Sequence, residues 1–123
     1  ENYDALTAGL QDIAEIVLFR STGGDYQSSY YCHSVLLSDE LAPKRFEIVS
    51  ELKQNGVGTS VYYPRPVPHF TYYREKYGYT DDTYPVAAWI SNNSIALPVG
   101  PHLDTDDMNY IVESLKQAIA KVK

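Results

Sequence analysis

The apolar positions of this chain follow a helical spacing most clearly at its C-terminal end. Residues recurring every three or four positions predict an amphipathic helix there, and we expect it to pack on the sheet. The apolar stripe consists of Met108, Ile111, Val112, Leu115, Ile119 and Val122. Asp104, Asp106 and Asp107 lie in or beside the first turn of this helix, where the helix dipole favours negative charge. Capping is the role expected of these acidic residues.

A second helix is predicted after Pro43, which suits the first turn of a helix. Phe46, Val49 and Leu52 repeat at helical spacing, and Gly56 is placed to end the segment.

Three shorter helical segments are also expected. Residues 1–9 resemble the last turns of a helix that ends near Gly9. Residues 70–77 predict a short helix ended by Gly78, and Pro85 opens another helix that runs through Ile90.

Four segments carry the composition of strands. Residues 15–19 form a short apolar run before the turn Gly23-Gly24-Asp25, and residues 28–37 predict a strand with both faces at least partly covered. Residues 57–63 predict a third strand, stopped by prolines that cannot donate to a ladder, and residues 94–97 predict a fourth.

This order contains no regular alternation of strand and helix. It predicts an α+β fold: a small, mostly antiparallel sheet covered by helices and ending in a long amphipathic helix. The 123 residues, 44% apolar and 21% charged, are enough for one core but not for two. We expect residues 1–123 to be a single domain.

Charge and composition exclude several classes of protein. The net charge is −6 and no cluster of Lys or Arg follows a face, which disfavours nucleic-acid binding. No apolar run approaches the length that spans a bilayer and no leader pattern is visible, so a cytoplasmic protein without a membrane partner is expected. Cys32 is the only cysteine, and a small buried apolar group is its expected role.

Complete catalytic machinery is not visible in the sequence. It contains no Gly-rich phosphate loop after a strand, no His-Glu-x-x-His pair and no Gly-x-Ser-x-Gly elbow. His33, His69 and His102 are too far apart to imply a metal site, and a single His commonly bonds a backbone carbonyl instead. No catalytic, cofactor or metal residue is therefore predicted.

The Tyr- and Pro-rich segment 61–79 is the candidate functional surface. Three prolines between positions 64 and 68 fix the backbone before His69, and such stiffness suits a binding site. Tyr62, Tyr63 and Arg65 offer phenolic and guanidinium donors for phosphate or sugar hydroxyls. The same tyrosines are equally typical of an amphipathic core or of an interface.

Four short motifs in this order resemble one enzyme family. They are Gly56–Pro64, Tyr72–Glu75, Pro85–Ala87 and Leu97–Leu103, followed by the last helix. Together they resemble the C-terminal small domain of the pyridoxal-phosphate-dependent nucleotide-sugar aminotransferases of the DegT/StrS family, over nearly the whole chain.

The resemblance implies a supporting role in a transamination. The family moves an amino group, usually from glutamate, onto a nucleotide-linked keto sugar, and the lysine that carries pyridoxal phosphate belongs to a large N-terminal domain. The implied partners are the nucleotide-linked sugar, the amino donor, this large domain and a second subunit. Residues 1–10 then correspond to the end of an interdomain helix, in a chain that lacks the large cofactor domain and is inactive alone.

The resemblance also implies which residues face the substrate. Tyr62 and Tyr63 match a pair, commonly His-Tyr in the family, that lies near the sugar and phosphates of the substrate. His69 corresponds loosely to a His that ends a Pro-x-His element, one position late. Ala88 stands where many members have Glu.

Two other hypotheses use the same segment differently. A free-standing binding or interaction module with this fold would use the Tyr/Pro loop for a ligand or partner without catalysis. A nucleotide-binding ferredoxin-like domain would differ in its strand order.

Overall fold

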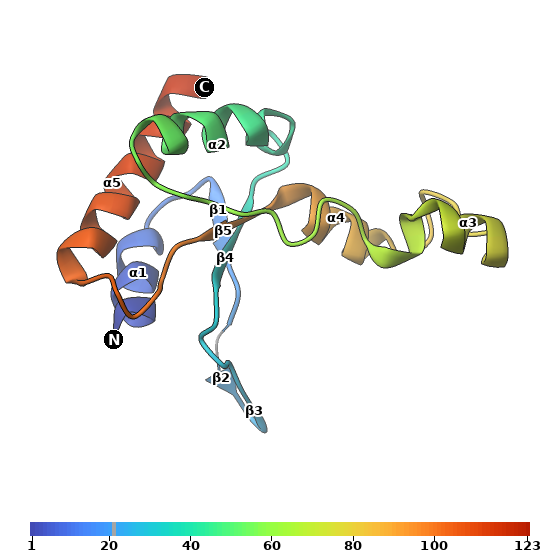
Figure 1. The fold of residues 1–123 in the computed structure, drawn as a ribbon, viewed down its shortest axis with the longest axis horizontal. Helices are drawn as coiled ribbons and strands as arrows, with labels where there is room; N and C mark the ends of the chain where they lie inside the picture. Colours follow the sequence, from blue (N-terminus) through green and yellow to red (C-terminus); the bar gives the residue numbers. More distant parts are fainter. Residues whose placement is uncertain (21) are drawn as a thin grey trace.

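The structure of the protein is a computed structural model, and the residues that it describes are 1–20 and 22–123. Three antiparallel strands lie at its centre (Figure 1). The strands are β1 (Ile16–Leu18), β4 (His33–Leu37) and β5 (Ser94–Leu97), with β4 in the middle. This arrangement confirms the predicted antiparallel sheet and the predicted strands at 15–19 and 94–97.

The register of the sheet directs alternate residues of β4 and β5 toward the core. Val35 pairs with Ile95, and His33 pairs with Leu97. Val35, Ile95 and Leu97 belong to the main core cluster. Leu36, whose neighbours along β4 face that cluster, points to the other face of the sheet and is still buried. Both faces of β4 are thus covered, as predicted, although the strand is shorter than residues 28–37.

Three helices cover one side of the sheet: α1 (Asn2–Leu10), α2 (Arg45–Gln54) and α5 (Thr105–Val122). A short 3-10 turn, η1 (Ala42–Lys44), carries Pro43 into α2. The long C-terminal helix packs mainly on α1 and α2, so it reaches the sheet only through the core that they share. Side chains that are wholly buried in that core include Leu6, Leu10, Leu37, Ile48, Leu52, Ile95, Met108 and Leu115. Each such side chain contributes roughly 1.5–3 kcal/mol relative to an exposed position.

Helix ends follow the chemistry that the sequence predicts. Asp104 and Asp107 form a capping box at the start of α5, each carboxylate accepting the backbone N–H of the other at 3.0 Å. Gly56 and Gly78 follow α2 and α3 with φ of 76° and 68°, a left-handed backbone that glycine adopts without steric cost.

Residues 64–93 form an arm that projects from the side of the core (Figure 1). It contains the 3-10 turn η2 (Val67–His69), α3 (Thr71–Tyr77) and α4 (Pro85–Asn93). α4 leads back to the sheet through β5, and α3 lies at the far end. Both predicted short helices are confirmed.

Two expectations are wrong. Residues 57–63 do not form a strand: Ser60 makes a single antiparallel bridge with Ala96, after which the chain turns into the proline segment that cannot extend a ladder. Phe46 is exposed, because α2 turns Arg45, Ile48 and Leu52 inward instead.

A second, smaller sheet was not predicted. β2 (Thr22–Gly23) and β3 (Tyr26–Gln27) pair as a hairpin that projects from the core on its own (Figure 1).

In the described parts of the chain, no helix is long and apolar enough to cross a membrane.

Candidate functional site

The arm carries a continuous set of aromatic rings. Tyr73 stacks on Tyr77 at 6.2 Å between centroids, Tyr77 stacks on Tyr79 at 5.5 Å, and Tyr79 meets Tyr84 edge-on at 5.6 Å. Tyr72 packs edge-on against Tyr73 at 5.1 Å. The rings stabilise the arm through one another, since offset and edge-on aromatic pairs are favourable beyond their buried area.

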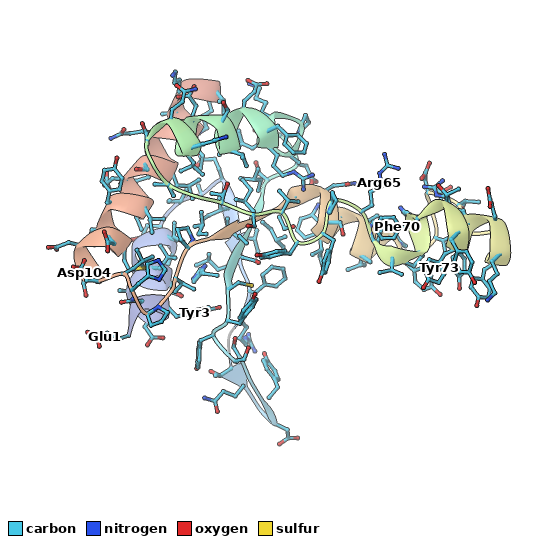
Figure 2. The ribbon with its side chains drawn as sticks, viewed as in Figure 1. Glu1, Tyr3, Arg65, Phe70, Tyr73 and Asp104 are labelled. Atoms are coloured by element: carbon cyan, nitrogen blue, oxygen red, sulfur yellow. The ribbon has the colours of Figure 1, made fainter. Side chains whose placement is uncertain are left out.

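Much of this aromatic surface remains exposed. Phe70, Tyr72, Tyr77 and Tyr84 are each more than a third exposed. Figure 2 places Arg65 and Phe70 at the neck of the arm and Tyr73 farther out on α3. Exposed apolar surface of this kind is typical of a binding or interaction face.

Hydrogen bonds hold α4 to the core. Arg45, only 6% exposed, donates from Nη1 to the carbonyl oxygens of Ser91 at 2.5 Å and Ser94 at 3.4 Å. These carbonyls lie at the C-terminal end of α4, where the helix dipole favours a cation. Burial lowers the pKa of the Arg45 guanidinium. The contact was not predicted, because a charged residue on a helix is usually solvated.

A second group of hydrogen bonds supports α4 from the loop after β4. Asn93 donates to the carbonyl oxygen of Leu37 at 2.8 Å and to Asp39 at 3.2 Å. Trp89 donates from its indole nitrogen to the same Asp39 carboxylate at 2.6 Å. The arm therefore has a fixed base.

Two hollows adjoin the predicted site residues. The first, about 240 Å³, lies beside the bridge between Ser60 and Ala96 and includes Tyr31, Cys32 and Tyr62 in its lining. Cys32 is partly exposed here rather than buried, and its Sγ lies 3.8 Å from the Ser34 hydroxyl.

The second hollow, about 540 Å³, lies within the arm. Its charged and polar lining consists of Arg65, His69, Arg74, Asp81 and Asn92, and Thr71, Pro66 and Ala88 complete it. It brings together residues of the proline segment, of α3 and of α4.

His69 holds the arm together from inside. It is 7% exposed, and its Nε2 lies 2.9 Å from the carbonyl oxygen of Thr83. Its own carbonyl oxygen accepts from Nε of Arg74 at 2.9 Å. These contacts make His69 a structural link between the two sides of the arm, which is the role expected of an isolated histidine.

The four residues predicted to bind substrate, Tyr62, Tyr63, Arg65 and His69, therefore do not line a single hollow. Tyr62 lies at the smaller hollow, whereas Arg65 and His69 line the larger one. Tyr63 is 68% exposed between them, with its ring 6.1 Å from that of Tyr62.

Arg74, Asp81 and Asn92 were not predicted as site residues, although they line the larger hollow. In the sequence, Arg74 was singled out only as a member of the motif Tyr72–Glu75. Asp81 is exposed on the turn between α3 and α4 and pairs with Arg74.

Residues 1–116 match the model of the DegT/DnrJ/EryC1/StrS aminotransferase family. The chain belongs to this family. The resemblance stated from the sequence motifs is confirmed.

Curated relatives of this aminotransferase-family chain share about a third of its residues over the aligned part. A pleiotropic regulatory protein of Geobacillus stearothermophilus is 34% identical over 76 residues, which are 62% of this chain and 20% of the relative. The uncharacterized protein MJ1066 of Methanocaldococcus jannaschii is 29% identical over 94 residues, which are 76% of this chain and 24% of the relative.

Solved structures of the family superpose over nearly the entire chain. The putative sugar aminotransferase Spr1654 of Streptococcus pneumoniae, in its PMP-form, aligns with a TM-score of 0.86 and 25% identity. The alignment covers 99% of this chain and 30% of that protein, and the PLP-form of the same protein aligns equally well. The chain therefore spans less than a third of the length of the family members that it matches.

Proposed function

We propose that this chain is the C-terminal small domain of a pyridoxal-phosphate-dependent aminotransferase that moves an amino group onto a nucleotide-linked keto sugar. Its role is to help close the active-site cleft and to bind the sugar nucleotide. The superposition on a putative sugar aminotransferase over 99% of this chain, with a TM-score of 0.86, is the observation that carries the proposal.

The lysines of this chain do not fit a cofactor site. Pyridoxal phosphate, when bound in the family, acts as an electron sink and needs a lysine for its attachment. Lys44 donates to the carbonyl oxygen of Val122, and Lys76 lies over the rings of Tyr72 and Tyr77. None of the hollows around the described residues of the candidate site has a lysine in its lining. We infer that the cofactor and its chemistry belong to the large domain.

The substrate-facing edge in this proposal is the segment that leads into the arm. Tyr62 presents an exposed phenol group at the smaller hollow, and Arg65 presents a guanidinium at the larger one. Tyr63, the next residue after Tyr62, presents a second exposed phenol group. Phenol and guanidinium donors suit sugar hydroxyls and phosphate oxygens. His69, whose imidazole is used inside the arm, contributes by fixing the lining rather than by donating to substrate.

The aromatic arm gives this domain a surface for its own large domain and for a second subunit. Tyr and Phe side chains are enriched at the centre of protein interfaces. An interaction module without catalysis is the second candidate, because the same exposed rings would serve an unrelated partner equally well.

The test compares two polypeptides. The full-length protein that contains this chain, supplied with pyridoxal phosphate and glutamate, is expected to aminate a nucleotide-linked keto sugar, whereas the 123-residue chain alone shows neither activity nor cofactor absorbance. An inactive full-length protein contradicts the aminotransferase proposal and favours the interaction module. Cofactor absorbance from the 123-residue chain alone contradicts the assignment of the cofactor lysine to the large domain.

A further inference from the structure

His33 is a buried histidine outside the arm. It is 2% exposed at the start of β4, and its ring faces α1. Nε2 lies 2.9 Å from the Thr7 hydroxyl, and the centroid of the ring lies 4.4 Å from that of Tyr3 at an interplanar angle of 40°. The side chain therefore joins the central strand of the sheet to the first two turns of α1, residues 2–7.

The hydrogen bonds around His33 define which ring nitrogen carries the proton. The Thr7 hydroxyl donates its one proton to the carbonyl oxygen of Tyr3 at 2.8 Å, so it accepts from Nε2–H of His33. Nδ1 is then the unprotonated nitrogen, and it is buried with no hydrogen-bond partner among the described residues. A proton on Nδ1 would add a buried donor without an acceptor and a buried positive charge.

No ion pair of His33 compensates for that charge in the described parts of the chain. The titratable side chains on the elements beside the ring are Tyr3 and Asp4 on α1 and Tyr30 and Cys32 on the loop before β4. Asp4 is 79% exposed, and the strands β1 and β5 carry no titratable side chain. The Tyr3 ring favours a nearby cation, but burial dominates and lowers the pKa of His33 from the ordinary value of 6.5.

The first two turns of α1 also hold the loop before α5. Nδ2 of Asn2 donates to the carbonyl oxygens of Gly100 at 3.2 Å and Leu103 at 2.8 Å. Leu6 is wholly buried and keeps this half of α1 in place at neutral pH, while Leu10 fixes the other half in the core. Detachment of residues 2–7 would therefore free the loop of residues 98–103 and leave the rest of the core packed.

We propose that His33 is a proton-controlled latch: the neutral ring ties residues 2–7 of α1 to β4, and protonation releases them together with the loop of residues 98–103. The closed form binds the proton more weakly than the open form, so the closed form is favoured above about pH 6.5 and opening increases as the pH falls below that value. The latch is a property of these elements alone and goes beyond the proposed function. In that function, it would make the end of the interdomain helix sensitive to acid.

The experiment is hydrogen–deuterium exchange of the 123-residue chain, read by NMR and corrected for the intrinsic pH dependence of exchange. The protection of the amides of residues 5–8 and of Leu103 is expected to fall about tenfold from about pH 7.5 to about pH 5.5. This factor follows because an open state with the ordinary histidine pKa of 6.5 gains about tenfold for each pH unit below it.

Low concentrations of urea separate opening of the latch from unfolding of the whole chain. A local opening exposes little surface, so the protection of residues 5–8 at about pH 5.5 is expected to depend weakly on urea. The amides of residues 111–119 in the buried part of α5 are expected to be at least about tenfold better protected and to depend steeply on urea.

Two variants assign the effect to His33. His33→Gln keeps an N–H donor for Thr7 but takes up no proton, so the protection of residues 5–8 is expected to be the same at both pH values. His102→Gln, at an exposed position of the loop, is the matched control and is expected to keep the tenfold change.

Three results overturn the proposal: equal protection of residues 5–8 at both pH values, an equal acid-induced loss in His33→Gln, or a urea dependence equal to that of residues 111–119. Should His33→Gln fail to fold, the ¹⁵N shifts of the His33 ring in the parent chain decide. A neutral ring with its proton on Nε2 at about pH 6 supports the latch, and a charged ring in the closed form overturns it. Transamination by the full-length protein is measured separately, so each proposal can fail without the other.

Discussion

The imidazole of His69 and the carbonyl oxygen of Thr83 join the two sides of the arm across 2.9 Å. His69→Ala removes this bond and leaves a carbonyl unpaired, which costs about 1–3 kcal/mol of local stability. Backbone amides between residues 69 and 84 are expected to exchange faster with deuterium, while those of the core are unchanged. His102→Ala, at an exposed position, is the control; equal protection of the arm in both variants would contradict this role.

Arg45 anchors α4 to the core. Arg45→Met removes the donor to Ser91 and Ser94, and the free energy of unfolding is expected to fall by about 2–3 kcal/mol. Urea denaturation measures the change, with Lys53→Met at an exposed position of the same helix as control. A stability equal to or above that of the parent chain would mean that burying the guanidinium costs more than its bonds return.

His33 makes stability depend on pH. The hydroxyl of Thr7 donates to the carbonyl oxygen of Tyr3, so it accepts at 2.9 Å from Nε2 of His33. Nδ1 of His33 is buried and has no hydrogen-bond partner among the described residues. His33 is 2% exposed, and burial lowers its pKa from the ordinary value of 6.5. As the pH falls below that value, the unfolded chain takes up a proton that the folded chain resists.

The free energy of unfolding is therefore expected to decrease from about pH 7 to pH 5, and His33→Gln is expected to flatten this part of the profile. His102→Gln should keep the slope. Glu15 and Asp81, whose carboxyl pKa values are lowered by Lys123 and Arg74, lose their contributions only at lower pH. An unchanged slope in His33→Gln would contradict the assignment.

Gly9 allows α1 and α5 to approach closely. A Cβ at this position would lie 2.6 Å from Cγ2 of Val112. Gly9→Ala is expected to lower the thermal midpoint despite the gain in helix propensity of about 1 kcal/mol. Val112→Ala in the same chain should recover part of the loss relative to the sum of the single variants. Strict additivity would contradict a direct contact.

The sequence predicted those elements whose determinants are local. The stripe of α5, the left-handed glycines after α2 and α3, and the apolar run of β5 depend on neighbours within a few residues. Whether residues 57–63 form a strand depends instead on a neighbouring strand to pair with, and in this segment Ser60 makes a single bridge, to Ala96. The local composition of residues 57–63 does not reveal that pairing stops after one bridge.

The candidate site shows the same division. Tyr62, Tyr63 and Arg65 stand out because prolines interrupt the chain beside them. Asn92 and Asp81 join the site through the return of α4 beside the proline segment, a contact between distant parts of the chain. The burial of Arg45 was not predicted, because a charged residue on a helix is usually solvated. Here its guanidinium donates to the carbonyl oxygen of Ser91 at the C-terminal end of α4.

In the function proposed above, Tyr62 and Tyr63 bind the nucleotide-linked sugar for chemistry carried out by another domain. The most direct measurement is steady-state kinetics of the full-length protein with Tyr62→Phe, Tyr63→Phe and, as control, Tyr26→Phe at the exposed hairpin. Loss of either hydroxyl is expected to raise KM for the nucleotide sugar by about 3- to 10-fold with little change in kcat, since a binding hydrogen bond contributes equally in the ground and transition states. KM values for both variants equal to that of Tyr26→Phe would contradict the claim.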